Sequence, residues 1–189
     1  MSCREEALAF YHKAYNYLVS AGRNPEIEYT RQLDFGACTD EHFLMEYAFV
    51  VISSGMKNQV AQRIFSRFNE KLDHSVIGHP GKRQAIARAI KEHHEWLAQL
   101  RVSTDKVTYL ETLPWIGPIT KYHLARNIGL DFVKPDRHLV RVATAFDYPD
   151  PYTMCSEISK EVGERIGVVD VVLWRYCNLR GTRNLEARP

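Results

Sequence analysis

Apolar residues recur three and four positions apart along most of the 189-residue chain. This spacing places them on one face of an α-helix. In the first such stretch, residues 4–20, the apolar positions are Leu8, Tyr11, Tyr15 and Leu18. No stretch alternates between apolar and polar residues as a half-buried strand does. The pattern therefore predicts an all-α protein.

Glycine, proline and serine clusters divide this pattern into separate helices. We expect helices at about 4–20, 40–52, 58–72, 82–100, 104–110, 118–128, 136–146, 153–167 and 168–179. Residues 26–38 are expected to be irregular, and residues 180–189 to form a frayed polar tail. Thr39 or Asp40 is the expected N-cap of the second helix. From Tyr47 to Ile52 that helix is apolar almost all round, which predicts that it is buried.

Composition is ordinary for a soluble protein, with 45% hydrophobic and 25% charged residues. The net charge of +2 gives no global basic field, so any nucleic-acid binding must use local basic patches. Apolar runs are far too short to span a membrane, and the start of the chain does not read as a signal peptide. We expect a cytoplasmic protein, or a nuclear one in a nucleated cell, with no membrane partner.

The four cysteines, Cys3, Cys38, Cys155 and Cys177, are scattered and include no C-x-x-C pair. This spacing argues against a zinc site and against a disulfide framework.

The strongest functional signal is residues 110–141, LETLPWIGPITKYHLARNIGLDFVKPDRHLVR. A short helix runs into a tight turn at Trp115 to Gly117, and Pro118 suits the first position of a second helix. Gly129 suits a left-handed position at the end of that helix. The pattern predicts a helix–hairpin–helix, whose turn would expose backbone N–H groups that can bind a phosphate.

Further along the same stretch, Lys134-Pro135 is expected to be extended, because proline restricts the residue before it. Asp136 then opens another helix. Its carboxylate can cap the free N–H groups of the first turn, or it can be held at the edge of a cleft as a chemical group.

These two segments together resemble the helix-hairpin-helix DNA glycosylase superfamily, the endonuclease III-like proteins. The matching residues are Leu113, Pro114, Ile116 and Gly117 in the hairpin, then Asp136, His138, Leu139, Arg141 and Val142. The resemblance implies an all-α, two-lobed fold with a DNA-binding cleft between the lobes. Residues 1–189 would form one unit, with one lobe at 40–133 carrying the helix–hairpin–helix at about 105–128. Residues 1–39 and 134–189 would form the second lobe.

The resemblance also implies that the protein is a monomer that binds double-stranded DNA, and it indicates which residues contact the DNA. They are Leu113, Pro114, Trp115, Ile116, Gly117, Ile119, Thr120, Lys121, Arg137, His138 and Arg141. Within this set, the amides of Gly117, Ile119 and Thr120 would hold a phosphate. The alternative for Lys121 and Arg137 is that they are solvated charges, and for His138 that it is structural. The backbone carbonyls of Glu111, Leu113 and Ile116 would hold a monovalent cation.

In the family, the turn after residue 52 fills the space left by the flipped base. The candidates for that wedge are Gly55, Met56 and Lys57, of which Met56 is the most suitable filler. The alternative is a plain helix–helix turn. Tyr29, Phe35, Trp115, Tyr122 and Trp174 are the aromatic residues available to stack on a flipped base. We favour Trp115, because a hairpin tip is exposed.

The chain departs from the family pattern at two hairpin positions. Trp115 stands where the family usually has glycine, so the positive-φ position of the turn could be altered. Ile119 stands where bifunctional members have a lysine, which leaves no obvious amine for Schiff-base chemistry. Lys121 and Lys134 are the nearest substitutes. Only Cys177 lies where relatives carry a four-cysteine iron–sulfur cluster, so we predict no cluster.

The resemblance makes Asp136 the candidate catalytic residue, which would stabilise positive charge on the deoxyribose as the base leaves. We predict a monofunctional DNA glycosylase that leaves an abasic site. The alternatives are a non-catalytic helix–hairpin–helix DNA-binding protein and a bifunctional glycosylase/lyase with a relocated lysine. The target base stays open: oxidised, alkylated, deaminated, mismatched, or hypermodified in foreign DNA.

Overall fold

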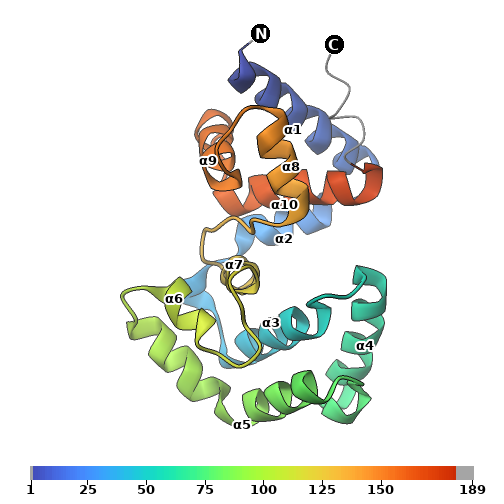
Figure 1. The fold of residues 1–189 in the computed structure, drawn as a ribbon, viewed down its shortest axis with the longest axis vertical. Helices are drawn as coiled ribbons and strands as arrows, with labels where there is room; N and C mark the ends of the chain where they lie inside the picture. Colours follow the sequence, from blue (N-terminus) through green and yellow to red (C-terminus); the bar gives the residue numbers. More distant parts are fainter. Residues whose placement is uncertain (1, 182–189) are drawn as a thin grey trace. The chain divides into compact units, whose positions relative to one another are not determined.

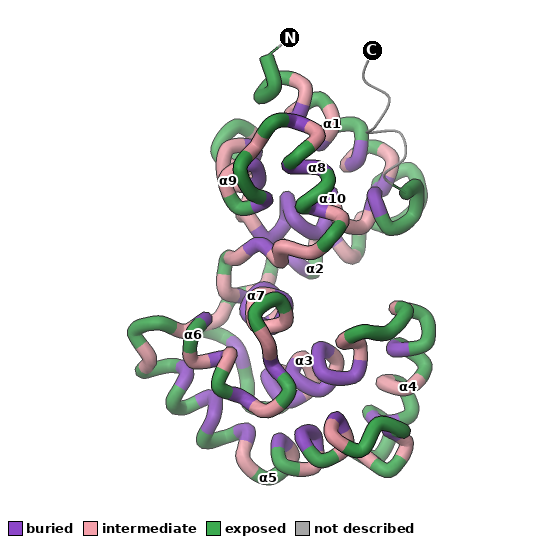
Figure 2. The backbone as a smooth tube through the Cα atoms, viewed as in Figure 1, coloured by how far each residue is buried: buried purple, intermediate pink, exposed green. Residues whose placement is uncertain are grey.

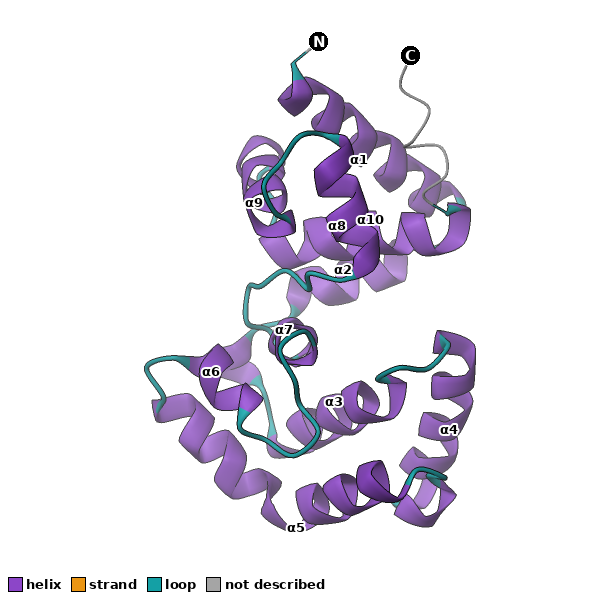
Figure 3. Ribbon diagram, in the orientation of Figure 1, coloured by secondary structure: helices purple, strands orange, loops and turns teal. Residues whose placement is uncertain are grey.

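The computed structural model describes residues 2–181, and every regular element within them is a helix (Figures 1 and 3). The α-helices are α1 (Cys3–Ser20), α2 (Asn24–Gln32), α3 (Asp40–Ser53), α4 (Asn58–Lys71), α5 (Pro80–Val102), α6 (Lys106–Glu111), α7 (Thr120–Asn127), α8 (Arg137–Ala145), α9 (Pro151–Val162) and α10 (Ile166–Arg180). Two short 3₁₀ helices, η1 (Phe35–Ala37) and η2 (His74–Val76), complete the set. The all-α prediction is confirmed.

The chain divides into two compact units, and the first one is discontinuous in sequence. Unit 1 holds Met1–Leu33 and Asp131–Pro189, whereas unit 2 holds Asp34–Leu130. Helices α1, α2, α8, α9 and α10 therefore belong to unit 1, and α3 to α7 belong to unit 2.

Helix α10 is the centre of unit 1. It packs against α1, α2, α8 and α9, and it is buried over most of its length (Figure 2). Leu18 from α1, Leu139 from α8 and Met154 from α9 are fully buried in the same core. The candidate residue Asp136 precedes α8, so its position depends on this core.

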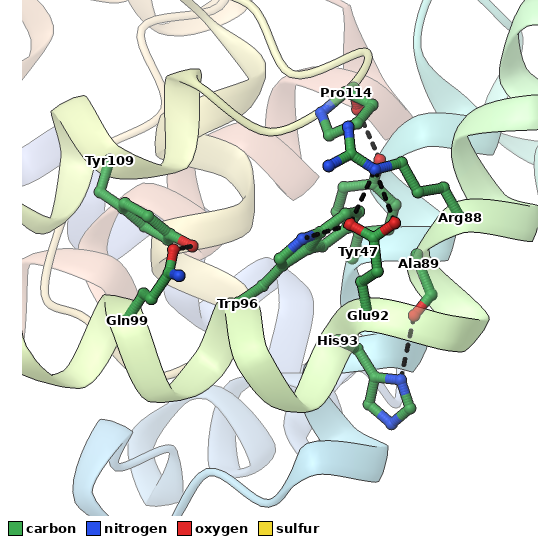
Figure 4. Close-up of polar contacts among 9 residues, drawn as sticks. All are labelled: Tyr47, Arg88, Ala89, Glu92, His93, Trp96, Gln99, Tyr109 and Pro114. Carbon is green, nitrogen blue, oxygen red and sulfur yellow. Dashed lines mark hydrogen bonds and ion pairs between the residues drawn. The ribbon is translucent and has the colours of Figure 1, made fainter.

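Helix α3 has the corresponding role in unit 2, where it packs against α4, α5 and α7. Phe43 and Tyr47 are fully buried on it, which confirms the prediction of a buried helix. The ring of Trp96 from α5 meets that of Tyr47 edge-on at 5.3 Å between centroids (Figure 4). Helices α6 and α7, the arms of the hairpin, pack against each other.

Several predicted helix ends are confirmed by their capping bonds. The Thr39 hydroxyl accepts the His42 N–H at 3.1 Å and caps α3. Gly129 has a φ of 92° just past α7, as the left-handed position predicted there requires. A β-carbon at this residue would lie 2.5 Å from the backbone nitrogen of Phe35, so only glycine fits.

Other predicted boundaries are wrong. Residues 26–38 are not irregular: α2 begins at Asn24, with Pro25 in its first turn, where a missing N–H costs nothing. Helix α7 begins at Thr120, not at Pro118.

The predicted border between the last two helices is also wrong. Gly163, with a φ of 68°, ends α9 before the predicted Gly167. Gly167 instead lies in the first turn of α10.

The predicted tail begins at Arg180, which the structure places at the end of α10, and residues 182–189 lie outside the described residues. Among the helices that the structure describes, we find none with the length and apolar character needed to cross a membrane.

Candidate functional site

The hairpin between α6 and α7 is anchored by apolar residues and by one buried tyrosine. Leu113 and Ile116 are buried, and the Ile116 N–H closes the turn on the Leu113 carbonyl at 3.1 Å. The hydroxyl of Tyr47, from α3, donates to the Pro114 carbonyl at 2.5 Å (Figure 4). The tip of the hairpin is thereby fixed to the core of unit 2.

Trp115 has a left-handed backbone conformation at the tip, which glycine adopts more readily than other residues. Its φ is 65°, and its side chain is 42% exposed. The expectation that tryptophan could alter this part of the turn is therefore wrong. The indole meets the His79 ring edge-on at 4.8 Å between centroids, and it lies directly against Gly81 in the first turn of α5. These contacts offset the cost of left-handed backbone at a bulky residue.

Two of the three predicted phosphate-binding amides are available. The Gly117 N–H donates to the Thr120 hydroxyl at 2.7 Å, so that amide has an internal partner. Within residues 2–181, no hydrogen bond engages the N–H of Ile119 or Thr120. Ile119 is also 49% exposed. These two amides, at the N-terminus of α7, are therefore open to an anion.

The basic side chain of the hairpin has an acidic partner. The Lys121 ammonium lies 2.5 Å from a Glu111 carboxylate oxygen, and this hydrogen bond raises the lysine pKa. A protonated, paired ammonium is a poor nucleophile. Lys121 is therefore unsuited to replace the missing lyase lysine.

One of the carbonyl oxygens predicted to bind a cation already accepts a hydrogen bond within the hairpin. The Leu113 carbonyl accepts the Ile116 N–H, although a carbonyl oxygen has a second lone pair. Backbone carbonyls suit a hard cation, so the donor type at Glu111, Leu113 and Ile116 fits such an ion.

The wedge candidates lie in the turn between α3 and α4. Gly55 has a φ of 68°, Met56 is 36% exposed, and Lys57 is the N-cap of α4. Lys82 of α5 holds this turn in place. Its buried ammonium donates to the carbonyls of Ile52 at 2.9 Å and Ser54 at 2.5 Å.

Lys82 was not anticipated from the sequence, because a lysine in the first turn of a helix usually points to solvent. Desolvation by burial lowers its pKa. The first turn of α5 therefore contacts two segments. Lys82 contacts the turn between α3 and α4, and Gly81 contacts Trp115 at the hairpin tip. All of these residues belong to unit 2.

In unit 1, Asp136 is the N-cap of α8. Its Oδ1 accepts the N–H groups of His138 at 2.9 Å and Leu139 at 3.2 Å. Its Oδ2 lies 3.9 Å from the Lys134 ammonium, and the carboxylate is 14% exposed. The capping prediction is confirmed. The cap uses one carboxylate oxygen and leaves the other on the side of Lys134.

The segment that leads into Asp136 is fixed at its backbone. The Asp136 N–H donates to the Lys134 carbonyl at 2.7 Å, closing a tight turn around Pro135. The Lys134 N–H donates to a carboxylate oxygen of Asp170 at 2.6 Å. Asp170 lies on α10 and is completely buried. Local sequence patterns do not predict this contact, because 36 residues separate its partners.

The basic candidates of α8 lie close to Asp136. Arg137 and Arg141 are exposed, and their spacing of four places them on one face of the helix. His138 is half-buried, and its Nδ1 has no hydrogen-bond partner in the described structure. Burial lowers the pKa of His138, and the three neighbouring cations lower it further, whereas Asp136 raises it.

The aromatic candidates are divided between the two units, with Tyr29 and Trp174 in unit 1 and the other three in unit 2. Tyr29 on α2 is 52% exposed, and the guanidinium of Arg175 lies over the Trp174 ring on α10 at 4.6 Å. Phe35 and Tyr122 belong to unit 2 and lie beneath the ammonium groups of Lys106 and Lys121.

A comparison with solved structures finds a similar fold in the 8-oxoguanine DNA glycosylase of Thermotoga maritima. The match has a TM-score of 0.68 and covers 94% of this chain and 98% of that chain, at 17% sequence identity. This chain has the fold of a helix-hairpin-helix DNA glycosylase. No protein-family model matches the sequence, and no curated protein sequence matches it. The likeness establishes the fold alone.

Proposed function

We propose that this protein is a monofunctional DNA glycosylase. It flips an altered base out of duplex DNA and hydrolyses the N-glycosidic bond, so that water adds at C1′, the base departs and an abasic site remains. The observation that carries the proposal is the Asp136 carboxylate. It is held at a helix N-terminus, with Oδ1 bonded to two backbone N–H groups and Oδ2 outside the cap, 3.9 Å from the Lys134 ammonium.

Departure of a base builds positive charge on the deoxyribose ring, as in glycoside hydrolysis. A fixed carboxylate about 4 Å from that charge gains ~4 kcal/mol at an effective dielectric of ~20. This energy corresponds to about a thousandfold in rate.

The remaining residues would bind DNA. The open amides of Ile119 and Thr120 would hold a phosphate, with Trp115 exposed beside them. Arg137 and Arg141 would pair with phosphates near Asp136. Such contacts position the duplex without reading its sequence.

Two further binding roles complete the proposal. Met56 would enter the base stack where the nucleotide is extruded. The carbonyls of Glu111, Leu113 and Ile116 would hold a monovalent cation that supports the hairpin.

The monofunctional assignment rests on the amines of the chain. Ile119 occupies the lyase position, and the Lys121 ammonium is paired with Glu111. One observation favours the bifunctional alternative: Lys134 places its amine 3.9 Å from Asp136. Sodium borohydride separates the two mechanisms, because it traps only a Schiff base. We expect no protein–DNA adduct, and an adduct that disappears in Lys134→Gln would establish the lyase instead.

The proposal is tested with duplexes that each carry one altered base, incubated with protein and then treated with hot alkali. 8-Oxoguanine is the first base to test, because the structural neighbour is an 8-oxoguanine DNA glycosylase. Strand cleavage that requires alkali shows base excision without lyase activity. Asp136→Asn keeps an oxygen for the cap, so we expect it to bind DNA normally and to lose about a thousandfold in rate.

The opposite outcome would support the non-catalytic alternative. If the protein binds duplex DNA tightly but releases no base from any of the duplexes, the enzymatic proposal is wrong. Cleavage by Asp136→Asn at the wild-type rate would contradict the assigned role of the carboxylate.

A further inference from the structure

The carboxylate of Asp170 is completely buried on α10. A charge in the protein interior is tolerated only when hydrogen bonds compensate for its lost hydration. One such bond comes from the backbone of Lys134, whose N–H lies 2.6 Å from Oδ2. The buried acid therefore binds the segment that presents Asp136, although it has no access to DNA itself.

Both backbone polar groups of Lys134 are engaged around Asp136. Its N–H donates to Asp170, and its carbonyl accepts the Asp136 N–H at 2.7 Å. Its ammonium lies 3.9 Å from Oδ2 of Asp136. Lys134 thus links Asp170 of α10 to the candidate catalytic carboxylate.

The hydrogen bonds that cap α8 do not determine how the chain enters this helix. They hold Oδ1 of Asp136 against the first turn of α8, whereas the direction from which the chain enters is set by Lys134 and Pro135. We propose that Asp170 is a positioning residue for Asp136. By binding the Lys134 N–H it keeps Oδ2 of Asp136 in the place where a deoxyribose cation is stabilised. This inference rests on the proposed glycosylase function.

A second link between the same two segments, made by the exposed Asp131, provides a control. Asp131 also joins the segment before α8 to α10, since its carboxylate accepts the N–H groups of Ile166 at 3.3 Å and Gly167 at 2.9 Å. It does not touch Lys134 through any of these bonds. Removing Asp131 costs hydrogen bonds to the same helix but leaves the backbone of Lys134 held.

The test compares two uncleavable abasic analogues in otherwise identical duplexes, and it does not require the target base to be known. A pyrrolidine analogue carries a protonated ring nitrogen, like the sugar cation, whereas a tetrahydrofuran analogue is neutral. We expect the wild-type protein to bind the pyrrolidine duplex about a hundredfold more tightly, because Asp136 faces the charge.

Asp170→Ala should reduce this preference by about tenfold or more, because small displacements of a catalytic group are costly. Affinity for the tetrahydrofuran duplex should stay within about twofold of the wild type. Asp170→Leu fills the vacated space, and replacing a buried charge with an apolar residue is often tolerated, so it serves if Asp170→Ala does not fold. Asp170→Asn keeps an oxygen that can accept the Lys134 N–H and should restore most of the preference.

The possible results separate the two proposals. A wild-type protein with no preference for the cationic duplex would overturn the glycosylase function, and the role of Asp170 with it. A wild-type preference that survives in Asp170→Ala and Asp170→Leu would overturn the positioning role alone. An Asp131→Ala variant that loses the preference as strongly as Asp170→Ala would also overturn it, because general loosening of the segment would then explain both.

Discussion

A β-carbon at position 81 would lie 2.4 Å from Cζ3 of Trp115. The indole of the hairpin tip therefore packs directly on the backbone of α5, and glycine is required for this contact. Trp115 has a φ of 65°, a conformation that costs a bulky residue about 1–2 kcal/mol. The contacts with Gly81 and His79 hold the tip in a conformation that the tryptophan itself disfavours.

We expect Gly81→Ala to displace the indole and lower the free energy of unfolding by about 1–3 kcal/mol. Urea denaturation followed by tryptophan fluorescence measures this loss. Gly78→Ala is the matched control, since a β-carbon there meets no atom within 4 Å. Equal losses in the two variants would show that the contact has no special role.

A double-mutant cycle isolates the same contact. Trp115→Gly removes the indole and relieves the left-handed strain, so Gly81→Ala should cost less than about 0.5 kcal/mol in that background. Additive effects would contradict the packing described. Because Trp115 lies beside the open amides, Trp115→Gly should also weaken binding to an undamaged duplex.

Lys82 offers a test of the turn between α3 and α4. Lys82→Met would leave the carbonyls of Ile52 and Ser54 without their buried donor and should cost about 1–3 kcal/mol of stability. Arg83→Met removes a neighbouring side chain that donates to the Ile77 carbonyl instead. Both variants should be destabilised, but only Lys82→Met should slow base excision in single-turnover kinetics. Equal excision rates would exclude a role for Lys82 in placing Met56.

The sequence predicted the elements that carry strong local signals. Helical periodicity identified most of the helices, and Asp136 was recognised as a helix start because N-capping depends on adjacent residues. Helix α2 was missed because only Ile27 and Thr30 are buried on it, too few for a clear apolar face. A proline is typical of a break between helices, but Pro25 lies in the first turn of α2.

Contacts between distant residues could not be predicted in the same way. The first turn of α10 is capped by Asp131 from 35 residues away. The residues next to the start of α10 therefore do not indicate where this helix begins. The bond from Lys134 to Asp170 and those from Lys82 to the end of α3 are equally remote. Periodicity indicates which face of a helix is buried, but not which polar group it meets there.

His138 should make stability and activity depend on pH. Its pKa is lowered from 6.5, first by burial and then by the charges of Arg137, Arg141 and Lys134, against an opposing effect of Asp136. The unfolded chain therefore binds a proton at this residue at a higher pH than the folded chain does. The contribution of His138 to the free energy of unfolding should be fully present above the unfolded pKa of 6.5. It should decrease as pH falls below that value.

The measurement is the urea midpoint of the wild type and of His138→Gln at several values between about pH 5 and 7. The wild type should lose stability toward acid more steeply than the variant. Base excision should show the same difference, because an imidazolium beside Asp136 would repel the cation that forms on the sugar. If the stability difference between the two proteins is constant over this range, the protonation of His138 is not linked to folding. If the excision rate of His138→Gln falls toward low pH as steeply as that of the wild type, the fall is caused by another group.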